Sequence, residues 1–309
     1  MSFLQQLPDE LWLQIFTSTF TESKALYQLG KVCKKWLMWW QDSVQVLTCE
    51  MPADKGYLAR FRNASQLTLG NAGYLQGIYG RWLLACPPSV RTLCTAYIPE
   101  SGYQQWEACG LAPQIRHLVL MRDSCMKTTT LDGFTCLETL AINCNECVAS
   151  PKSLAQLTGL ITLSLSTSRS ITTRFPASSL ASLTQLRHLE YISRLSVQMF
   201  IDYSFLSHMT RLESLDLSTT ETTISYLNQP PHYKEMARQL EAVTKMSRLT
   251  RLVLRGNQPF PLGAIRHHTQ LTHLDVSDRS LGDGDLIILK GLKNLTFLKT
   301  DPPYQPFFK

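Results

Sequence analysis

The sequence predicts an α/β solenoid in which short parallel strands stack side by side and helices or turns return behind them. Three observations lead to this fold class. A leucine-containing phrase recurs along the chain, its copies follow one another at similar intervals, and the first 45 residues lack it. A chain of 309 residues has room for many such units.

The recurring phrase is a leucine, two residues, a second leucine, one residue and a third apolar residue. Its alternation of apolar and polar positions has a period of two, which is typical of a strand with one buried face. Seven clear copies and three looser ones begin at Ala64, Val90, Ile115, Leu137, Leu160, Leu186, Leu212, Leu249, Leu271 and Leu295.

Successive copies start 22 to 26 residues apart, except for one interval of 37. This spacing is that of the leucine-rich repeat, in which each strand is followed by a helix or a 3₁₀ turn. A single unit cannot bury its leucines alone, so the units stack and their strands form a curved parallel sheet. We expect about ten units over residues 46–309, with helices or turns on the convex side and a C-terminal cap after Asp301.

The interval of 37 residues predicts an additional helix on the convex side. Pro230 and Pro231 interrupt the chain. Apolar residues at spacings of three and four then follow at Tyr233, Met236, Ala237, Leu240 and Val243.

Composition and charge limit the class of function. The net charge of +6 is spread without a long run of like charges, which is a weak indication of nucleic-acid binding. All nine cysteines lie between Cys33 and Cys147, a distribution that favours reduced thiols in the cytosol or nucleus over a disulfide framework. The chain has neither a basic N-terminal signal segment nor the roughly 18 continuous apolar residues of a membrane helix. We therefore expect no nucleic-acid or membrane partner.

Potential metal sites are incomplete in the sequence. Cys144 and Cys147 have the spacing of a zinc-binding pair, but no second such pair exists to complete four ligands. His267 and His268 are adjacent, point apart, and are expected to be surface polar residues. We predict no metal, no cofactor and no catalytic residue, since hydrolase, metalloprotease, phosphate-binding and dinucleotide motifs are all missing. Asp283 or Asp285 is expected to cap a helix.

The sequence predicts that residues 1–45 form a separate helical module. Leu7-Pro8-Asp9-Glu10-Leu11 predicts a helix start, because proline suits the first turn and acidic residues oppose the helix dipole there. Ile15 and Phe16 continue its apolar face. A second apolar face includes Leu29, Val32, Cys33 and Trp36. So short a segment buries little surface by itself and needs a partner surface.

Leu-Pro-x-Glu-Leu, then Ile-Phe, then Val-Cys-Lys-Lys-Trp resembles the F-box, and the whole chain is similar to the F-box/leucine-rich-repeat proteins. The segment 17–25 is longer than in the usual module. The resemblance implies a non-catalytic substrate receptor of an SCF-type ubiquitin ligase, with the module docked on a Skp-type adaptor and, through it, a cullin scaffold. The adaptor contacts it implies are Leu7, Pro8, Leu11, Ile15, Phe16, Leu29, Val32, Cys33 and Trp36.

Two hypotheses follow for the repeats. In the first they hold an unknown protein target for ubiquitination, in the cytosol or nucleus, or in the host cytosol for a microbial effector. In the second the chain is a non-ligase interaction scaffold whose N-terminal helices only cap the solenoid. Exposure of Leu7, Ile15 and Phe16 would distinguish the two, because a cap buries them and a docking module does not.

The target is expected on the concave face, where side chains between the buried leucines project. The target-binding candidates are Tyr97, His117, Val119, Met121, Glu190, Ile192, Asp216, Arg251, Val253, Arg255, His273 and Asp275. We expect Arg251 and Arg255 to flank Val253 on one strand and to grip an acidic target. The alternative is that these arginines balance Asp216 and Asp275 on neighbouring strands.

Overall fold

The structure is a computed structural model that describes residues 44–49, 60–69, 86–95, 110–120, 126–129, 131–144, 147–149, 151–167, 177–193, 202–218, 233–256, 260–279 and 281–301. The predicted adaptor contacts and the cap after Asp301 lie outside these residues. The chain divides into two compact units, unit 1 from Met1 to Met121 and unit 2 from Arg122 to Lys309.

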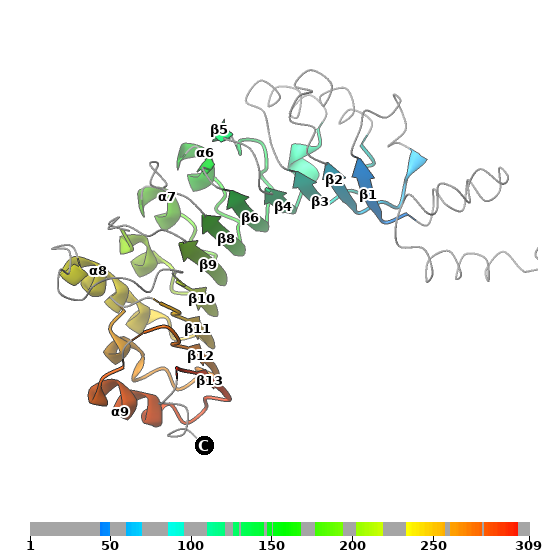
Figure 1. The fold of residues 1–309 in the computed structure, drawn as a ribbon. Helices are drawn as coiled ribbons and strands as arrows, with labels where there is room; N and C mark the ends of the chain where they lie inside the picture. Colours follow the sequence, from blue (N-terminus) through cyan, green and yellow to red (C-terminus); the bar gives the residue numbers. More distant parts are fainter. Residues whose placement is uncertain are drawn as a thin grey trace, which may run out of the picture. The chain divides into compact units, whose positions relative to one another are not determined.

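Unit 1 contains four parallel strands in chain order (Figure 1). They are β1 (Val46–Cys49), β2 (Gln66–Leu69), β3 (Thr92–Thr95) and β4 (His117–Leu120). The pairing register aligns Leu47, Leu67, Leu93 and Leu118, and all four are buried. A 3₁₀ turn, η4 (Ala112–Gln114), precedes β4. The leucines therefore form one continuous row in the core of this unit.

The main sheet of unit 2 has seven parallel strands, again in chain order. They are β6 (Thr139–Cys144), β8 (Thr162–Thr167), β9 (His188–Ser193), β10 (Ser214–Asp216), β11 (Arg251–Val253), β12 (His273–Asp275) and β13 (Phe297–Lys299). The second leucine of each phrase pairs with the next, from Leu140 through Leu252 to Leu298. This register puts the leucine of every unit on the same side of the sheet, as period-two alternation predicts.

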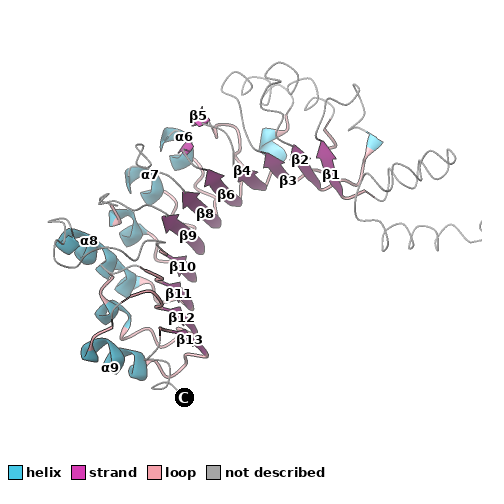
Figure 2. Cartoon of the chain, in the orientation of Figure 1, coloured by secondary structure: helices cyan, strands magenta, loops and turns pink. Residues whose placement is uncertain are grey.

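Helices and 3₁₀ turns lie on one face of the unit 2 sheet (Figures 1 and 2). They are α6 (Pro151–Ala155), α7 (Ala177–Ala181), η5 (Ser204–His208), α8 (Tyr233–Leu240), η7 (Glu241–Lys245), η8 (Leu262–Ile265) and α9 (Asp283–Gly291). Neighbouring members of this layer pack against one another along the chain. The helix predicted in the long interval is confirmed as α8, and it continues into η7.

A repeated hydrogen bond fixes the edge where the chain enters each strand. The hydroxyl of Thr250 donates to the carbonyl oxygen of Glu213 at 3.1 Å, that of Thr272 to Thr250 at 3.1 Å, and that of Thr296 to Thr272 at 3.0 Å. The backbone N–H groups of the same threonines donate to the same carbonyls. Successive units are thereby held in one register. The strands, the buried leucines and this register together make the chain a leucine-rich-repeat solenoid.

Three details differ from the sequence prediction. β1 is an additional unit ahead of the ten, with Val44 in the place of the first leucine. Strands β5 (Met126–Thr129) and β7 (Cys147–Ala149) form a second, two-stranded parallel sheet. His268 is buried, so its prediction as a surface residue was wrong: its Nε2 donates to the carbonyl oxygen of Val243 at 3.0 Å.

The N-terminus of α9 shows which acidic residue caps it. The backbone N–H of Gly282, the residue before the helix, donates to Oδ2 of Asp285 at 3.0 Å. The predicted capping role therefore belongs to Asp285, which takes the third helical position, as glutamate or glutamine does in a capping box.

Candidate protein-binding site

The strand face of unit 2 presents two rows of side chains that alternate with the buried leucines. The first row runs from β8 to β13 through Thr162, His188, Ser214, Arg251, His273 and Phe297. The second row runs through Ser164, Glu190, Asp216, Val253, Asp275 and Lys299. Neighbouring members of a row are about 4.8 Å apart, the spacing between strands. The first row contains one arginine, two histidines and one phenylalanine, and the second carries three carboxylates.

The structure brings half of the predicted target-binding residues together in these rows. Glu190, Asp216, Val253 and Asp275 belong to the second row, and Arg251 and His273 to the first. Ile192 lies farther along β9.

The other candidates are elsewhere. His117 and Val119 lie on β4 of unit 1, where they alternate with buried leucines. Tyr97 and Met121 lie outside the described residues. Arg255 follows β11 in a turn.

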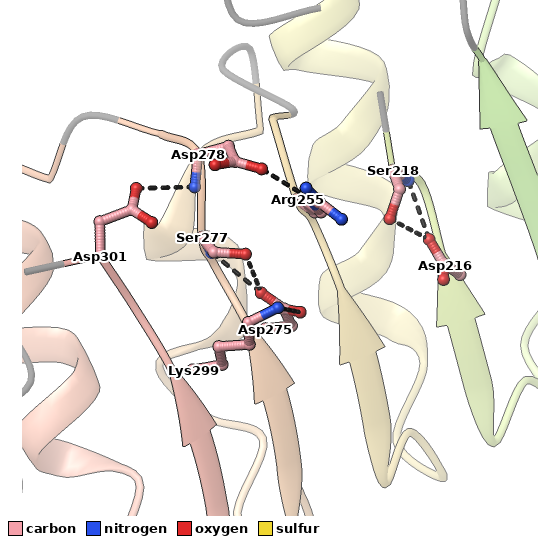
Figure 3. A network of polar contacts seen from close by, with 8 residues as sticks. All are labelled: Asp216, Ser218, Arg255, Asp275, Ser277, Asp278, Lys299 and Asp301. Atoms are coloured by element: carbon pink, nitrogen blue, oxygen red, sulfur yellow. Dashed lines mark hydrogen bonds and ion pairs between the residues drawn. The ribbon is translucent and has the colours of Figure 1, made fainter. Parts of the chain in front are cut away.

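Two aspartates end their strands with the same hydrogen bonds (Figure 3). Oδ1 of Asp216 accepts from the backbone N–H of Ser218 at 2.9 Å and from its hydroxyl at 2.5 Å. Oδ1 of Asp275 accepts from Ser277 in the same way, at 3.0 and 2.6 Å. The sequence encodes this as Leu-Asp-x-Ser in both units, where a short polar side chain hydrogen-bonds the backbone two residues on.

The two carboxyl groups nevertheless have opposite electrostatic surroundings. Burial raises the pKa of Asp216, and the charge of Glu190 on the next strand adds to the rise, against the hydrogen bonds from Ser218 and the charge of Arg251. Burial also acts to raise the pKa of Asp275, but the hydrogen bonds from Ser277 and the charge of Lys299 outweigh it and lower the pKa. Lys299 Nζ lies 3.4 Å from Oδ2 of Asp275.

This contrast predicts opposite effects of the same substitution. An asparagine keeps an oxygen for the serine hydrogen bonds and removes only the charge. Asp216→Asn should raise the melting temperature at pH 7. A carboxyl group with a raised folded-state pKa makes the fold less stable as the pH rises through that pKa, and the asparagine removes this loss. The gain should vanish in acid below the normal aspartate pKa of about 3.9.

Asp275→Asn is the matched substitution with the opposite sign. In the wild type the folded-state pKa of Asp275 is lowered, so its ionised carboxylate stabilises the fold at neutral pH. This stability is lost as the pH falls through the folded-state pKa. The variant should melt below the wild type at pH 7, and the difference should shrink in acid. Melting curves of both variants from pH 3 to 8 test this, and equal shifts of one sign would contradict it.

Arg255 does not share a strand with Arg251. β11 ends at Val253, and in the following turn Nε of Arg255 lies 2.5 Å from Oδ2 of Asp278 (Figure 3). This carboxylate raises the pKa of Arg255. Asp278 has a left-handed backbone with φ of 58°, and its N–H donates to Oδ2 of Asp301 at 2.7 Å. The expected pair of arginines flanking Val253 on one strand is therefore wrong, because the strand is too short to hold both.

Arg251 has a different environment from Arg255. Its side chain is exposed and, among the described residues, forms no hydrogen bond or ion pair. On the next strand His273 stacks on Phe297, with ring centroids 4.0 Å apart and an interplanar angle of 2°. Burial and then the charge of Arg251 lower the pKa of His273. An exposed cation thus lies beside an aromatic pair, a combination that is frequent at the centre of protein interfaces.

Val253 separates the two aspartates of the second row. It pairs with Asp216 on one side and Asp275 on the other, and is only 6% exposed. Two strand spacings, about 9.6 Å, therefore separate the two aspartate positions. Across the described ranges, no group of three or more His, Cys, Asp or Glu side chains is placed to hold a metal ion. None of the helices in these ranges is long and apolar enough to cross a membrane.

The strand face of unit 1 is less charged. Burial raises the pKa of the Cys94 thiol on β3, and Nε2 of Gln66 donates to its Sγ at 3.7 Å. His117 and Val119 on β4 are the neighbours of Thr92 and Cys94 in the pairing register. These side chains form a half-buried, mostly uncharged surface.

Comparisons with family models and with curated proteins find no match. Among solved structures, the chain is similar to an internalin from Listeria monocytogenes, with a TM-score of 0.48 and 17% identity over 94% of this chain and 92% of that one. A leucine-rich-repeat protein from Leptospira interrogans has a TM-score of 0.48 and 15% identity, over 95% and 87% of the two chains. The functional domain of InlJ from Listeria monocytogenes, which includes a cysteine ladder, has a TM-score of 0.45 and 15% identity, over 87% and 51%.

The fold assignment rests on the register and buried leucines of this chain itself. They define a leucine-rich-repeat fold whose strand face in unit 2 carries mostly polar side chains. Phe297 and Lys299 also belong to this face, at the offsets from Leu298 that His273 and Asp275 have from their own leucine. Lys299 follows from the strand alternation of the sequence, whereas Phe297 was absent from the predicted site.

Proposed function

We propose that the chain is the substrate-recognition subunit of an SCF-type ubiquitin ligase, in which residues 1–45 dock on a Skp-type adaptor and the repeats bind a protein target. The observation that carries the proposal is the order of the two parts: an F-box-like segment stands directly before a leucine-rich-repeat array. The chain itself would catalyse nothing, and ubiquitin transfer would be performed by the other subunits.

The strand face of unit 2 supports the target-binding half of this proposal. Arg251 is exposed without a partner among the described residues, and the stacked rings of His273 and Phe297 adjoin it. Phe297 is 44% exposed, an unusual amount for a large apolar side chain. Arginine and aromatic side chains are the residues that most often carry binding energy in interfaces.

A non-ligase interaction scaffold is the second candidate. It is favoured by the strand face itself, whose two rows of side chains lie within unit 2. In this case the N-terminal helices only cap the solenoid. The two candidates differ in whether a Skp-type adaptor binds the chain.

Capture of the adaptor is the experiment that separates them. The purified full chain is mixed with a purified Skp-type adaptor bound to a cullin N-terminal domain, and the mixture is resolved by size-exclusion chromatography. Co-elution at low micromolar concentration supports the ligase subunit. Separate elution of a folded chain, with target proteins still captured from a lysate, supports the scaffold.

Charge reversal tests the target face. Arg251→Glu should reduce target capture on the order of tenfold at low salt, since interfacial charges govern association rate and specificity. The effect should weaken as salt shortens the Debye length below about 10 Å. Arg255→Glu makes the same charge change but breaks the pair with Asp278, so it should cost stability of at most about 1 kcal/mol and leave capture intact.

The measurement is quantitative mass spectrometry of co-purified proteins, with melting curves of both variants. An unchanged target set with folded Arg251→Glu would place the target elsewhere. A drop in melting temperature for Arg251→Glu would instead support the view that this arginine balances Asp216, whose pKa it lowers.

A further inference from the structure

The turns that lead into β10, β11, β12 and β13 carry two exposed basic residues each. These turns are residues 207–211, 244–248, 266–270 and 290–294. The basic side chains are His208, Arg211, Lys245, Arg248, Arg266, His267, Lys290 and Lys293, and all are exposed. The same twenty positions contain no aspartate or glutamate. We name these eight side chains the basic ridge.

The four turns are structurally equivalent. In each, the N–H of the first leucine of the phrase donates to the carbonyl three residues earlier, at 3.0 to 3.3 Å. The residue that supplies this carbonyl is buried in every turn: Met209, Met246, His268 and Leu292. The threonine hydrogen bonds from Thr250, Thr272 and Thr296 hold neighbouring units together just beyond the turns. The side chains of the basic ridge therefore follow one another along one edge of unit 2.

Most of the charge on this ridge is not neutralised by the protein. The side chains of Lys245, Arg248, Arg266 and Lys293 make no hydrogen bond or ion pair with other described residues. The opposite edge of the strands differs, because there Arg255 pairs with Asp278 and Lys299 lies beside Asp275 (Figure 3). Unit 2 thus has one internally balanced edge and one cationic edge.

Helix capping does not account for the ridge. Basic residues at the end of a helix interact favourably with its dipole, and Lys245 and Lys290 lie in the last turns of η7 and α9. However, the turns 155–159 and 181–185 follow helices α6 and α7 in the same way and contain no charged residue. The fold of a unit therefore does not require a basic turn, and the accumulation begins only at β10.

From this geometry we infer that the basic ridge binds an acidic polypeptide segment. The twenty positions contain no phenylalanine, tyrosine or tryptophan on which bases could stack. They also contain none of the exposed large apolar side chains with which a protein inserts into a bilayer. Each turn leads directly into the first row, where Arg251 and His273 continue the ridge onto the strand face.

Such a partner would place its carboxylates beside the basic ridge, and the rest of its surface would contact the strand face. The inference rests on the proposed function in one respect, that the partner of the repeats is a protein. It does not depend on adaptor docking.

The test uses the purified full chain and a fluorescein-labelled polyglutamate peptide in fluorescence anisotropy at low salt. Lys245→Glu with Arg248→Glu should weaken binding at least about tenfold, because two unpaired cations of one turn become anions. Lys152→Glu with Lys234→Glu changes the net charge equally at exposed positions of α6 and α8 outside the ridge, and should bind like the wild type. Lys245→Gln with Arg248→Gln gives an intermediate loss and serves if the reversal impairs folding.

Three outcomes would overturn the inference: equal weakening by the ridge and control variants, which would indicate only net charge; no peptide binding by a folded chain; or tighter ridge-dependent binding of a single-stranded RNA or of phosphatidylserine vesicles. Adaptor binding is measured in parallel on the same variants. If the chain binds the peptide but not the adaptor, the inference about the basic ridge stands and the ligase proposal fails. If the chain binds the adaptor but not the peptide, the ligase proposal stands and the inference about the basic ridge fails.

Discussion

Ile15→Ala combined with Phe16→Ala is expected to weaken binding of the Skp-type adaptor more than tenfold and to leave the melting of the repeats unchanged. Each truncation removes a large apolar contact worth roughly 1.5–3 kcal/mol when fully buried. A factor of ten corresponds to about 1.4 kcal/mol, so even half of the combined loss exceeds it. Isothermal titration calorimetry with purified adaptor measures the loss directly.

Thr17→Ala with Ser18→Ala is the matched control. It makes two truncations in the same segment at positions to which the F-box resemblance gives no adaptor contact. The control should bind like the wild type. Unchanged binding by the Ile15/Phe16 variant, with a normal fold, would remove the F-box assignment. Loss of repeat stability together with binding would favour the capping role, because the two side chains would then be part of the core.

The strand positions of the repeats were predictable because burial imposes a strict period. Each of the ten phrases forms a strand, and the leucines at equal offsets pair with one another, as Leu215 does with Leu252. β1 was missed because Val44 and Cys49 take the places of leucines. The β5–β7 sheet was missed because Met126–Thr129 and Cys147–Ala149 have no alternating pattern.

The site was predictable only as far as the strands extend. Arg251, His273 and Asp275 were placed correctly because their offsets from a buried leucine are fixed by the pleat. Arg255 lies beyond the end of β11, where the backbone turns and the period-two rule no longer applies. His268 was predicted at the surface because histidine is polar, but it occupies the buried turn position that Met246 fills in the preceding unit.

The sequence did not predict the basic ridge for a related reason. Its residues lie in turns, where charge is normal and no apolar period marks equivalent positions. Only the buried turn residue, Met209, Met246, His268 or Leu292, aligns the four turns. Once they are aligned, two exposed basic residues recur in each turn, and the preceding uncharged turns show that the recurrence is not imposed by the fold.

Leu252→Ala is expected to destabilise unit 2 by roughly 2–5 kcal/mol, the range for a fully buried leucine that leaves a cavity. Leu252 is completely buried and lies between Leu215 and Leu274 in the leucine row. Leu298→Ala is the matched control, since it is the same truncation at the same offset of β13, where the side chain is only half-buried. Less apolar area is lost there, and the cost should be about 1 kcal/mol.

The position of Leu252 adds a second, qualitative expectation. In a solenoid each unit contacts mainly its neighbours, so the stability of the array depends on every interface along it. A cavity at β11 weakens the interfaces with both β10 and β12 and should broaden or split the urea unfolding transition. Within the described ranges Leu298 lies at one strand interface, that of β12 with β13, so Leu298→Ala should shift the transition without splitting it. Equal losses of stability from the two variants, measured by circular dichroism, would contradict a continuous leucine row through β11.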